Sequence, residues 1–288
     1  MGFVRTAAGW IVPDDCEFSR MPLSVEFAHE RDAHIFFREH DHQYFICGLN
    51  CYSSSTSVCH SQFSHFDAPA MAQSLVMKPA FRKGEGQYSK YRDFVAMHSE
   101  ASDAELVAAL IDKWDNDGRE ASALGTTMHR NIELRLNGLP YSDHSVEFTF
   151  YSNFERECIH GRNWLIYRTE WLIWTDLPVK ICGSIDALFV DPDGHYHMRD
   201  WKRSKQISYH GFGKKGAPPF DHLPDCNYIA YSLQQNVYAE ILRRYYDIEV
   251  QSMAIVVCYP GNDDFLEIPI RRMDKEVEFL FNQFSVHR

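Results

Sequence analysis

The sequence predicts an α/β domain with a mixed central β-sheet flanked by helices. Residues 103–137 and 145–160 carry apolar positions at helical spacing. Residues 164–174, 179–190 and 195–203 are rich in β-branched and aromatic residues and form three consecutive strand candidates. A helix and a further strand follow, and such a βα crossover adds parallel pairing to an antiparallel meander.

The N-terminal third is predicted to contain short elements. Residues 34–47 have two strand-like runs around a polar turn, which favours a β-hairpin. Two short helices are expected between residues 53 and 78, with a Pro-containing break after Asp67. Residues 78–92 carry five Lys/Arg against one Glu and contain glycines, which is typical of a mobile basic loop.

The remaining elements follow from the same signals. Gly118 interrupts the long helical pattern, so we expect two helices between residues 103 and 137. After the three strand candidates come a Gly/Pro/Lys loop at 211–220 and a helix at 227–246. Strands at 250–259 and 265–270 and a final helix complete the prediction.

The composition fits one intracellular globular domain. No Pro/Gly/Ser-rich linker divides the 288 residues, so we expect residues 1–100 to form a hairpin and helical elaboration packed on a core of residues 101–288. The eight cysteines include no Cys-x-x-Cys pair and are typical of reduced, structural thiols. Residues 1–15 lack the apolar core of a signal peptide, and no 18-residue apolar run predicts a membrane span. We therefore expect a location in the cytoplasm or nucleus.

Residues 183–205 place two carboxylates on strands that flank a turn. If the turn is the five residues 191–195, Asp186 faces Asp200 across the hairpin. Directly opposed side chains have Cβ atoms about 4.5–5.5 Å apart, and like charges so placed are destabilising. Lys202 shares a face with Asp200, because successive strand residues point to opposite faces. A cation between the two acids would relieve their repulsion.

Hard oxygen ligands at that separation suit Mg²⁺ or Mn²⁺, which commonly bind through one or two carboxylates plus a substrate phosphate. Lys202 would then orient or deprotonate a metal-activated water, or stabilise charge on a phosphate. Two alternatives stay open: the three residues form a surface charge ladder, or a four-residue turn places Asp186 opposite Arg199 instead. We interpret Asp191 and Asp193 as turn residues.

The residues of this hairpin resemble the core motif of the PD-(D/E)XK nuclease superfamily. In the run GSIDALF…HMRDWKRSK, Asp186 corresponds to the first metal-binding acid and Asp200-Trp201-Lys202 to the D-x-K element. Upstream, GTTMHRNIE is similar to the helical motif of the RecB-like branch, in which a histidine, here His129, supplies a metal ligand. Downstream, Gln234-Gln235-Asn236-Val237-Tyr238 fits the Gln-x-x-x-Tyr helix of the same branch.

The resemblance covers residues 120–245 and implies a restriction-endonuclease-like core within residues 101–288. Glu170 matches a glutamate frequent in this branch, with either a role beside the metal ligands or a plain ion pair. Trp201 would touch the metal through its backbone carbonyl. Gln234 and Tyr238 would help to position the nucleic acid and the active-site groups.

The cofactor that the resemblance implies is Mg²⁺ or Mn²⁺. Some RecB-like nucleases also hold an iron–sulfur cluster through one early cysteine and three cysteines after the Gln-x-x-x-Tyr helix. Only Cys258 lies beyond Tyr238 in this chain, so we expect no iron–sulfur cluster. The sequence has no GxxxxGK[ST] motif, so a helicase, or another replication or repair protein, would be a separate partner.

An acidic protein that cuts a polyanion needs a local positive path, since the net charge of −11 argues against general basic coating. Residues 202–215 carry five Lys/Arg and no acid, and with residues 78–92 they would line a channel. The basic side chains expected to contact nucleic acid are Arg203, Lys205, Lys214 and Lys215. The aromatic residues Tyr88, Tyr91, Tyr209 and Phe212 interleave with these charges. They would stack on bases of a single strand, or would merely anchor solvated loops.

Together these features lead us to expect a Mg²⁺- or Mn²⁺-dependent nuclease that hydrolyses DNA phosphodiester bonds. An exonuclease acting on single-stranded or end-containing DNA in replication, recombination or repair fits best. The catalytic residues would be Glu170, Asp186, Asp200 and Lys202. An RNA-directed nuclease with the same site, and a catalytically inactive nucleic-acid-binding scaffold, are the alternatives.

Overall fold

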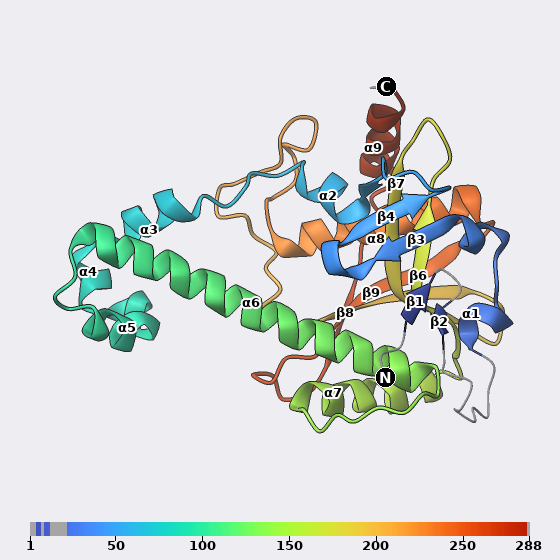
Figure 1. Ribbon diagram of the computed structural model, residues 1–288, viewed down its shortest axis with the longest axis horizontal. Helices are drawn as coiled ribbons and strands as arrows, with labels where there is room; N and C mark the ends of the chain where they lie inside the picture. The colour runs from blue at the N-terminus through green and yellow to red at the C-terminus, as the bar shows by residue number, and fades with distance from the viewer. Residues whose placement is uncertain (1–3, 7–8, 12–21, 287–288) are drawn as a thin grey trace. The chain divides into compact units, whose positions relative to one another are not determined.

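The computed structural model describes residues 4–6, 9–11 and 22–286 (Figure 1). Cys16 and most of the N-terminal segment considered for a signal peptide lie outside these residues. Contacts group the chain into two compact units, one formed by the described residues up to Ser64 together with those from Thr127 onward, the other by residues 65–126. The boundary expected at residue 100 falls inside the second unit.

The first unit contains a six-stranded mixed β-sheet. Its strands are β5 (Ser53–Ser54), β6 (Leu165–Trp174), β7 (Ile181–Val190), β8 (Tyr196–Lys202), β9 (Val250–Val257) and β10 (Leu266–Pro269). The order is β10-β9-β8-β7-β5, and β6 also pairs with β7. The β8–β9 and β5–β7 pairs are parallel and the others antiparallel. The predicted α/β fold with a mixed sheet is therefore confirmed.

Helices cover both faces of this sheet. They are α1 (Leu23–Glu26), α2 (Ser55–His60), α7 (Val146–Phe154) continued by the π-helical turn η4 (Glu155–His160), α8 (Asn227–Tyr245) and α9 (Asp274–Val286). Apolar side chains of α2, α8 and α9 share one core cluster with Leu188, and those of α7 share another with Ala187 and Phe189. Adjacent residues of β7 thus enter opposite cores, which explains why the strand ends in the unbroken apolar run of residues 187–190.

The N-terminal part of the first unit is joined to this sheet by a hairpin. The strands β3 (Ile35–Arg38) and β4 (Gln43–Ile46) pair antiparallel, as predicted for residues 34–47. Ile35 and Ile46 pack with Trp174 of β6. Short helical turns η1 (Glu30–His34) and η2 (Glu39–Asp41) flank β3, and β1 (Val4–Thr6) pairs with β2 (Gly9–Ile11).

In the second unit, the prediction of a mobile basic loop at residues 78–92 is wrong. Instead of a mobile loop, residues 78–92 form α4 (Pro79–Arg82) and the 3₁₀-helix η3 (Gly86–Tyr91), between α3 (Ala68–Val76) and α5 (Arg92–Met97). The physical reason is aromatic burial: Phe81 is fully buried, and the rings of Tyr88 and Tyr91 pack against it. These two tyrosines anchor the segment.

A second correction concerns the long helix. Residues 103–137 were expected to form two helices, but α6 (Asp103–Leu136) is continuous (Figure 1). Glycine costs only about 1 kcal/mol in a helix interior. At Gly118 nothing lies near the missing side chain, so no contact forces a break there. The boundary between the two compact units falls within this helix.

The described cysteines are all unpaired thiols, and Cys59, Cys158, Cys182 and Cys258 are buried. Burial raises the pKa of Cys258 to about 12. Among the described residues, none of the helices has both the length and the apolar character needed to cross a membrane.

Candidate metal centre

Three carboxylates lie in a row across three adjacent strands. The β7–β8 register pairs Ala187 with Arg199, so the next residues along, Asp186 and Asp200, face each other as the five-residue turn predicts. The competing register, with Asp186 opposite Arg199, is wrong. In β6, the pairs on either side of Glu170 place it opposite Asp186. A row of three acids on neighbouring strands is destabilising unless cations neutralise it.

Glu170 has an unusual backbone for a strand residue. Its φ angle is 43°, in the left-handed region that non-glycine residues seldom occupy. One carboxylate oxygen accepts a hydrogen bond from the Ser184 hydroxyl at 3.0 Å. Strained backbone of this kind costs on the order of 1–3 kcal/mol and tends to occur at functional sites. At this position the Glu170 carboxylate faces His129.

His129 reaches the same place from α6. Its Nδ1 atom lies 3.6 Å from Glu170 Oε1 and 3.5 Å from Asp186 Oδ2. Its Nε2 atom lies 2.8 Å from the Trp201 carbonyl oxygen. Because a carbonyl only accepts, Nε2 carries a proton, so Nδ1 is the nitrogen that faces the carboxylates and that can bind a metal ion once it is deprotonated.

These side chains fit a divalent cation. The donor atoms of His129, Glu170 and Asp186 all lie within 4.8 Å of one another. Ligands on opposite sides of a Mg²⁺ ion with bonds of about 2.1 Å are about 4.2 Å apart, and adjacent ligands are closer. The distances of 3.6 and 3.5 Å from His129 Nδ1 to Glu170 and Asp186 fall below that limit. The resemblance implied Asp200 and the Trp201 carbonyl as ligands; here the donor group has Glu170 instead, and the carbonyl contacts the imidazole.

Asp200 is paired with the predicted catalytic lysine. Its Oδ2 lies 2.6 Å from Lys202 Nζ, and only 7% of the Asp200 side chain is exposed. The ammonium group also lies 5.1 Å from the ring centre of Tyr231 on α8, at the distance of a cation–π contact. The backbone N–H of Trp201 donates to Asp186 Oδ2 at 2.8 Å. Both acids are thus held by short, defined contacts.

The electrostatics of the site reflect its crowded negative charge. Burial, with a further contribution from Asp200, raises the pKa of Asp186 to about 7, although His129 acts against the rise. Burial alone would lower the pKa of His129, but the charges of Asp186 and Glu170 raise it to about 9. Burial also opposes charge on Lys202, yet Asp200 and Asp186 move its pKa above the ordinary value. Without a bound metal, protons and ammonium groups balance the acids.

The Gln-x-x-x-Tyr pair lies on α8 beside this row. Gln234 donates one hydrogen bond to the Tyr238 hydroxyl and one to the Thr56 hydroxyl, both at 2.8 Å. Tyr238 is buried, and its ring packs so closely on Gly183 that a Cβ atom at that position would lie only 2.5 Å from the ring. A buried ring cannot stack on a base, so its contacts instead fix Gln234 against β7.

The predicted basic contacts divide into two groups. Arg203 lies 2.6 Å from Glu147 on α7 and faces the ring of Tyr259, so its charge is neutralised within the protein. Lys205, Lys214 and Lys215 are exposed, and the described part of the chain supplies none of them with a carboxylate partner.

Sequence reasoning missed two residues of the site, Thr56 and Tyr231. Thr56 lies in a run of hydroxyl residues at the start of α2, and it is brought to α8 by the parallel β5–β7 pairing. Tyr231 precedes Gln234 by three residues on the same helix face. That spacing was the available signal for Tyr231, whereas no local pattern points to Thr56.

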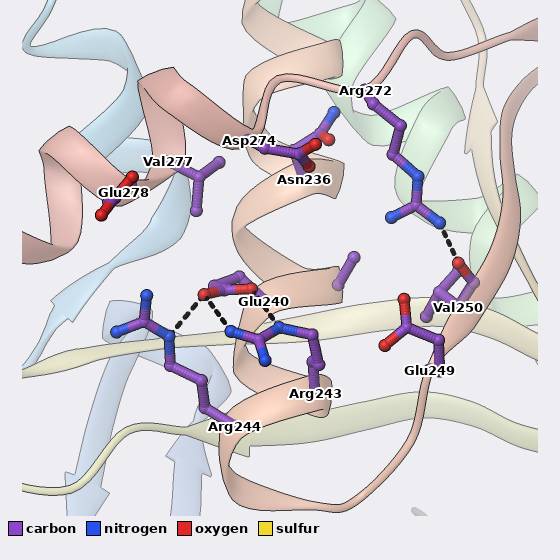
Figure 2. Close-up of a pocket in the computed structure, with 11 residues that line it drawn as sticks. Asn236, Glu240, Arg243, Arg244, Glu249, Val250, Arg272, Asp274, Val277 and Glu278 are labelled. Atoms are coloured by element: carbon purple, nitrogen blue, oxygen red, sulfur yellow. Dashed lines mark hydrogen bonds and ion pairs between the residues drawn. The ribbon is translucent and has the colours of Figure 1, made fainter.

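A separate pocket lies at the C-terminal end of α8 and does not include the row of acids. Its volume is about 410 Å³, and it is lined by side chains from α8, α9 and the start of β9. Figure 2 shows Arg243 and Arg244 both turned toward Glu240, and each forms an ion pair with it. Asp274, Glu278 and Glu249 also line the wall, so the pocket has no excess positive charge for a polyanion.

Comparison with known proteins yields structural neighbours but no sequence relative. No family model and no curated protein matches the chain. A solved structure described as "Crystal structure of SSO0001" aligns over 48% of this chain at 15% identity with a TM-score of 0.25. The alignment spans about half of that protein, 55% of its chain.

Proposed function

We propose that this protein is a Mg²⁺- or Mn²⁺-dependent nuclease that hydrolyses DNA phosphodiester bonds. The observation that carries the proposal is the row Glu170, Asp186 and Asp200 on three adjacent strands, with His129 and Lys202 directed at it. The His129 Nδ1 atom lies within 3.6 Å of both Glu170 and Asp186, Lys202 pairs with Asp200, and the donor spacing suits a metal ion.

Different side chains would have different roles in such a reaction. His129, Glu170 and Asp186 would hold the ion, and a divalent cation supplies Lewis-acid polarisation of phosphate and activation of water. Trp201 orients two of these ligands, since its N–H donates to Asp186 and its carbonyl meets His129. Such supporting contacts are typical of metal-binding histidines and carboxylates.

Lys202 would stabilise the charge that develops on the phosphate. Its raised pKa keeps it an ammonium at neutral pH, which favours electrostatic stabilisation over a role as general base. The contacts with Asp200 and the Tyr231 ring hold Nζ in place before substrate arrives. A positioned cation of this kind is typically worth about 10²–10³ in rate.

The decisive experiment compares linear and covalently closed circular DNA, with single-stranded DNA and RNA as further substrates, in Mg²⁺, Mn²⁺ or EDTA. We expect metal-dependent cleavage of DNA that Asp186→Asn reduces at least about 100-fold. Asp193→Asn is the matched control, because this exposed aspartate lies on the turn of the same hairpin. Cleavage of linear DNA alone would identify an end-dependent exonuclease.

Other outcomes would replace the proposal. Cleavage of RNA but not DNA would make the protein an RNA-directed nuclease with the same site. Tight DNA binding without cleavage, together with no heat of Mn²⁺ binding, would indicate an inactive scaffold. If no nucleic acid is degraded in either metal, the proposal fails.

A further inference from the structure

The segment between β8 and α8 is a folded loop with an exposed tip. Its base is fixed to α8 by a hydrogen bond from the Ser208 N–H to Asn227 and by the Tyr209 ring, which lies 4.5 Å from the ring of Tyr228. Farther out, the Asp225 N–H donates to the Lys214 carbonyl. Figure 1 draws this segment as the orange loop leading into α8. Tyr209 thus anchors the loop.

Phe212 occupies the tip and serves no packing role. It is 92% exposed, and the core clusters and ring pairs of the described residues do not include it. Phe212 and Gly213 have φ angles of 48° and 88°, and the Lys214 N–H donates to the Gly211 carbonyl at 2.8 Å, as in a type I′ turn. The first central position of such a turn favours Asn, Asp or Gly. A phenylalanine there costs conformational energy and exposes an apolar ring.

The surroundings of this ring are cationic. Lys214 and Lys215 follow it after Gly213, and both are exposed with no carboxylate partner among the described residues. Of the acids on the loop, Asp225 accepts a hydrogen bond from the Ser64 hydroxyl, and Asp221 lies farther along the chain. An exposed aromatic ring beside free ammonium groups offers a stacking surface and phosphate contacts together, which is the combination that binds unpaired nucleotides.

The loop is connected to the metal centre through α8. Tyr228, which packs on Tyr209 at the base of the loop, lies one helical turn before Tyr231, a rise of about 4.5 Å. Tyr231 in turn lies under the ammonium group of Lys202. A strand that reaches the row of acids along this face of α8 therefore passes the base of the loop.

We propose that Phe212 stacks on an unpaired nucleobase of a single-stranded DNA segment leading to the metal centre, while Lys214 and Lys215 bind its phosphates. The inference rests on the proposed nuclease function and adds a substrate class to it, namely DNA with a single-stranded stretch. Duplex DNA keeps its bases paired and stacked, so the ring gives no comparable gain there.

The test measures binding of the full chain in EDTA to a labelled single-stranded oligonucleotide and to the blunt duplex of the same sequence. Phe212→Ala should weaken single-strand binding by roughly 5- to 150-fold, the range for one base–aromatic stack. Phe212→Trp should restore binding. Phe36→Ala, which removes an exposed phenylalanine from the β3–β4 hairpin, should leave it unchanged.

Salt dependence separates the ring from the lysines. The double variant Lys214→Ala/Lys215→Ala should reduce the slope of log affinity against log salt by about 1.4 for a single strand, whereas Phe212→Ala should leave the slope unchanged. Three results would each overturn the inference. Phe212→Ala could bind the single strand as tightly as wild type, it could lose as much affinity for the duplex as for the single strand, or Phe212→Trp could fail to restore single-strand binding. In those cases, metal-dependent DNA cleavage by the wild type would still support the proposed nuclease function. A wild-type protein that neither binds nor cleaves DNA would contradict both the nuclease function and the role of Phe212.

Discussion

The Nε2 atom of His129 lies 2.8 Å from the carbonyl oxygen of Trp201, and this contact joins α6 to the end of β8. It determines which imidazole nitrogen is available as a ligand, because the carbonyl accepts the Nε2 proton. The adjacent N–H of Trp201 binds Asp186. One peptide segment therefore orients both the imidazole and a carboxylate, while the Trp201 ring is buried on the opposite face against Tyr151 and Phe154.

Removal of the imidazole should weaken metal binding without unfolding the protein. His129→Ala leaves Glu170 and Asp186 as the remaining donors, so we expect Mn²⁺ affinity to fall at least about tenfold. Titration calorimetry measures the loss directly. His160→Ala is the control, since it removes an exposed histidine from η4. Unchanged Mn²⁺ affinity in His129→Ala would show that the histidine is not a ligand.

Lys202 should act on the reaction rather than on the metal. Lys202→Met keeps the length of the side chain but removes its charge, so we expect cleavage to slow by about 10²–10³. The Mn²⁺ affinity of this variant should equal or exceed that of the wild type, because a competing cation beside Asp200 is lost. Single-turnover rates at saturating Mn²⁺, with Lys275→Met on α9 as the exposed control, make the comparison. A rate equal to wild type would exclude a catalytic role.

A buried ion pair should dominate the attachment of the N-terminal segment to β6. Asp32 accepts a hydrogen bond from Arg168 at 2.7 Å and one from the Trp171 indole at 2.8 Å, and both charged side chains are more than nine-tenths buried. Asp32→Ala leaves a buried guanidinium without its partner, which costs about 3–5 kcal/mol.

Urea unfolding tests this value against an exposed pair in the same region. Asp176 binds Arg31, but its side chain is 54% exposed, so Asp176→Ala should cost at most about 1 kcal/mol. Similar losses in the free energy of unfolding for the two variants would mean that burial of the Asp32 ion pair does not increase its contribution to stability.

The sequence alone was sufficient to predict the hairpin that carries Asp186 and Asp200, because the hydrogen bonds that form its turn are local. Asp191 accepts hydrogen bonds from the N–H groups of Asp193 and His195, which fixes a five-residue turn and hence the register of Asp186 against Asp200. Interpreting Asp191 as a turn residue followed from the same chemistry. Alternation along β7 and β8 then determined the faces of the remaining side chains.

Other features depend on contacts distant in sequence. The left-handed backbone of Glu170 is stable only within the completed sheet, and no propensity predicts it. Its place opposite Asp186 requires the β6–β7 register, which the sequence of the connecting residues 175–180 does not determine by itself. Likewise, the basic composition of residues 78–92 indicated a loop, whereas burial of Phe81 against two tyrosines decided the outcome.

Metal binding and stability should depend on pH in a coupled way. The folded-state pKa values of Asp186 and His129, about 7 and about 9, lie above the ordinary values of 3.8 and 6.5. A raised pKa means that the metal-free fold binds protons more tightly than the unfolded chain. Its stabilisation is complete below the ordinary value and is lost as pH rises through the folded value.

A divalent cation requires the same two groups deprotonated, so protons compete with it. Mg²⁺ affinity should rise by up to about tenfold per pH unit for each proton displaced, and the Mg²⁺-induced increase in Tm should therefore grow between pH 6 and pH 9. Thermal unfolding with and without Mg²⁺ measures this difference at each pH. In His129→Ala the growth should be shallower, because one proton fewer is displaced when the ion binds. A Mg²⁺ effect that is constant across this range would contradict a metal bound by these side chains.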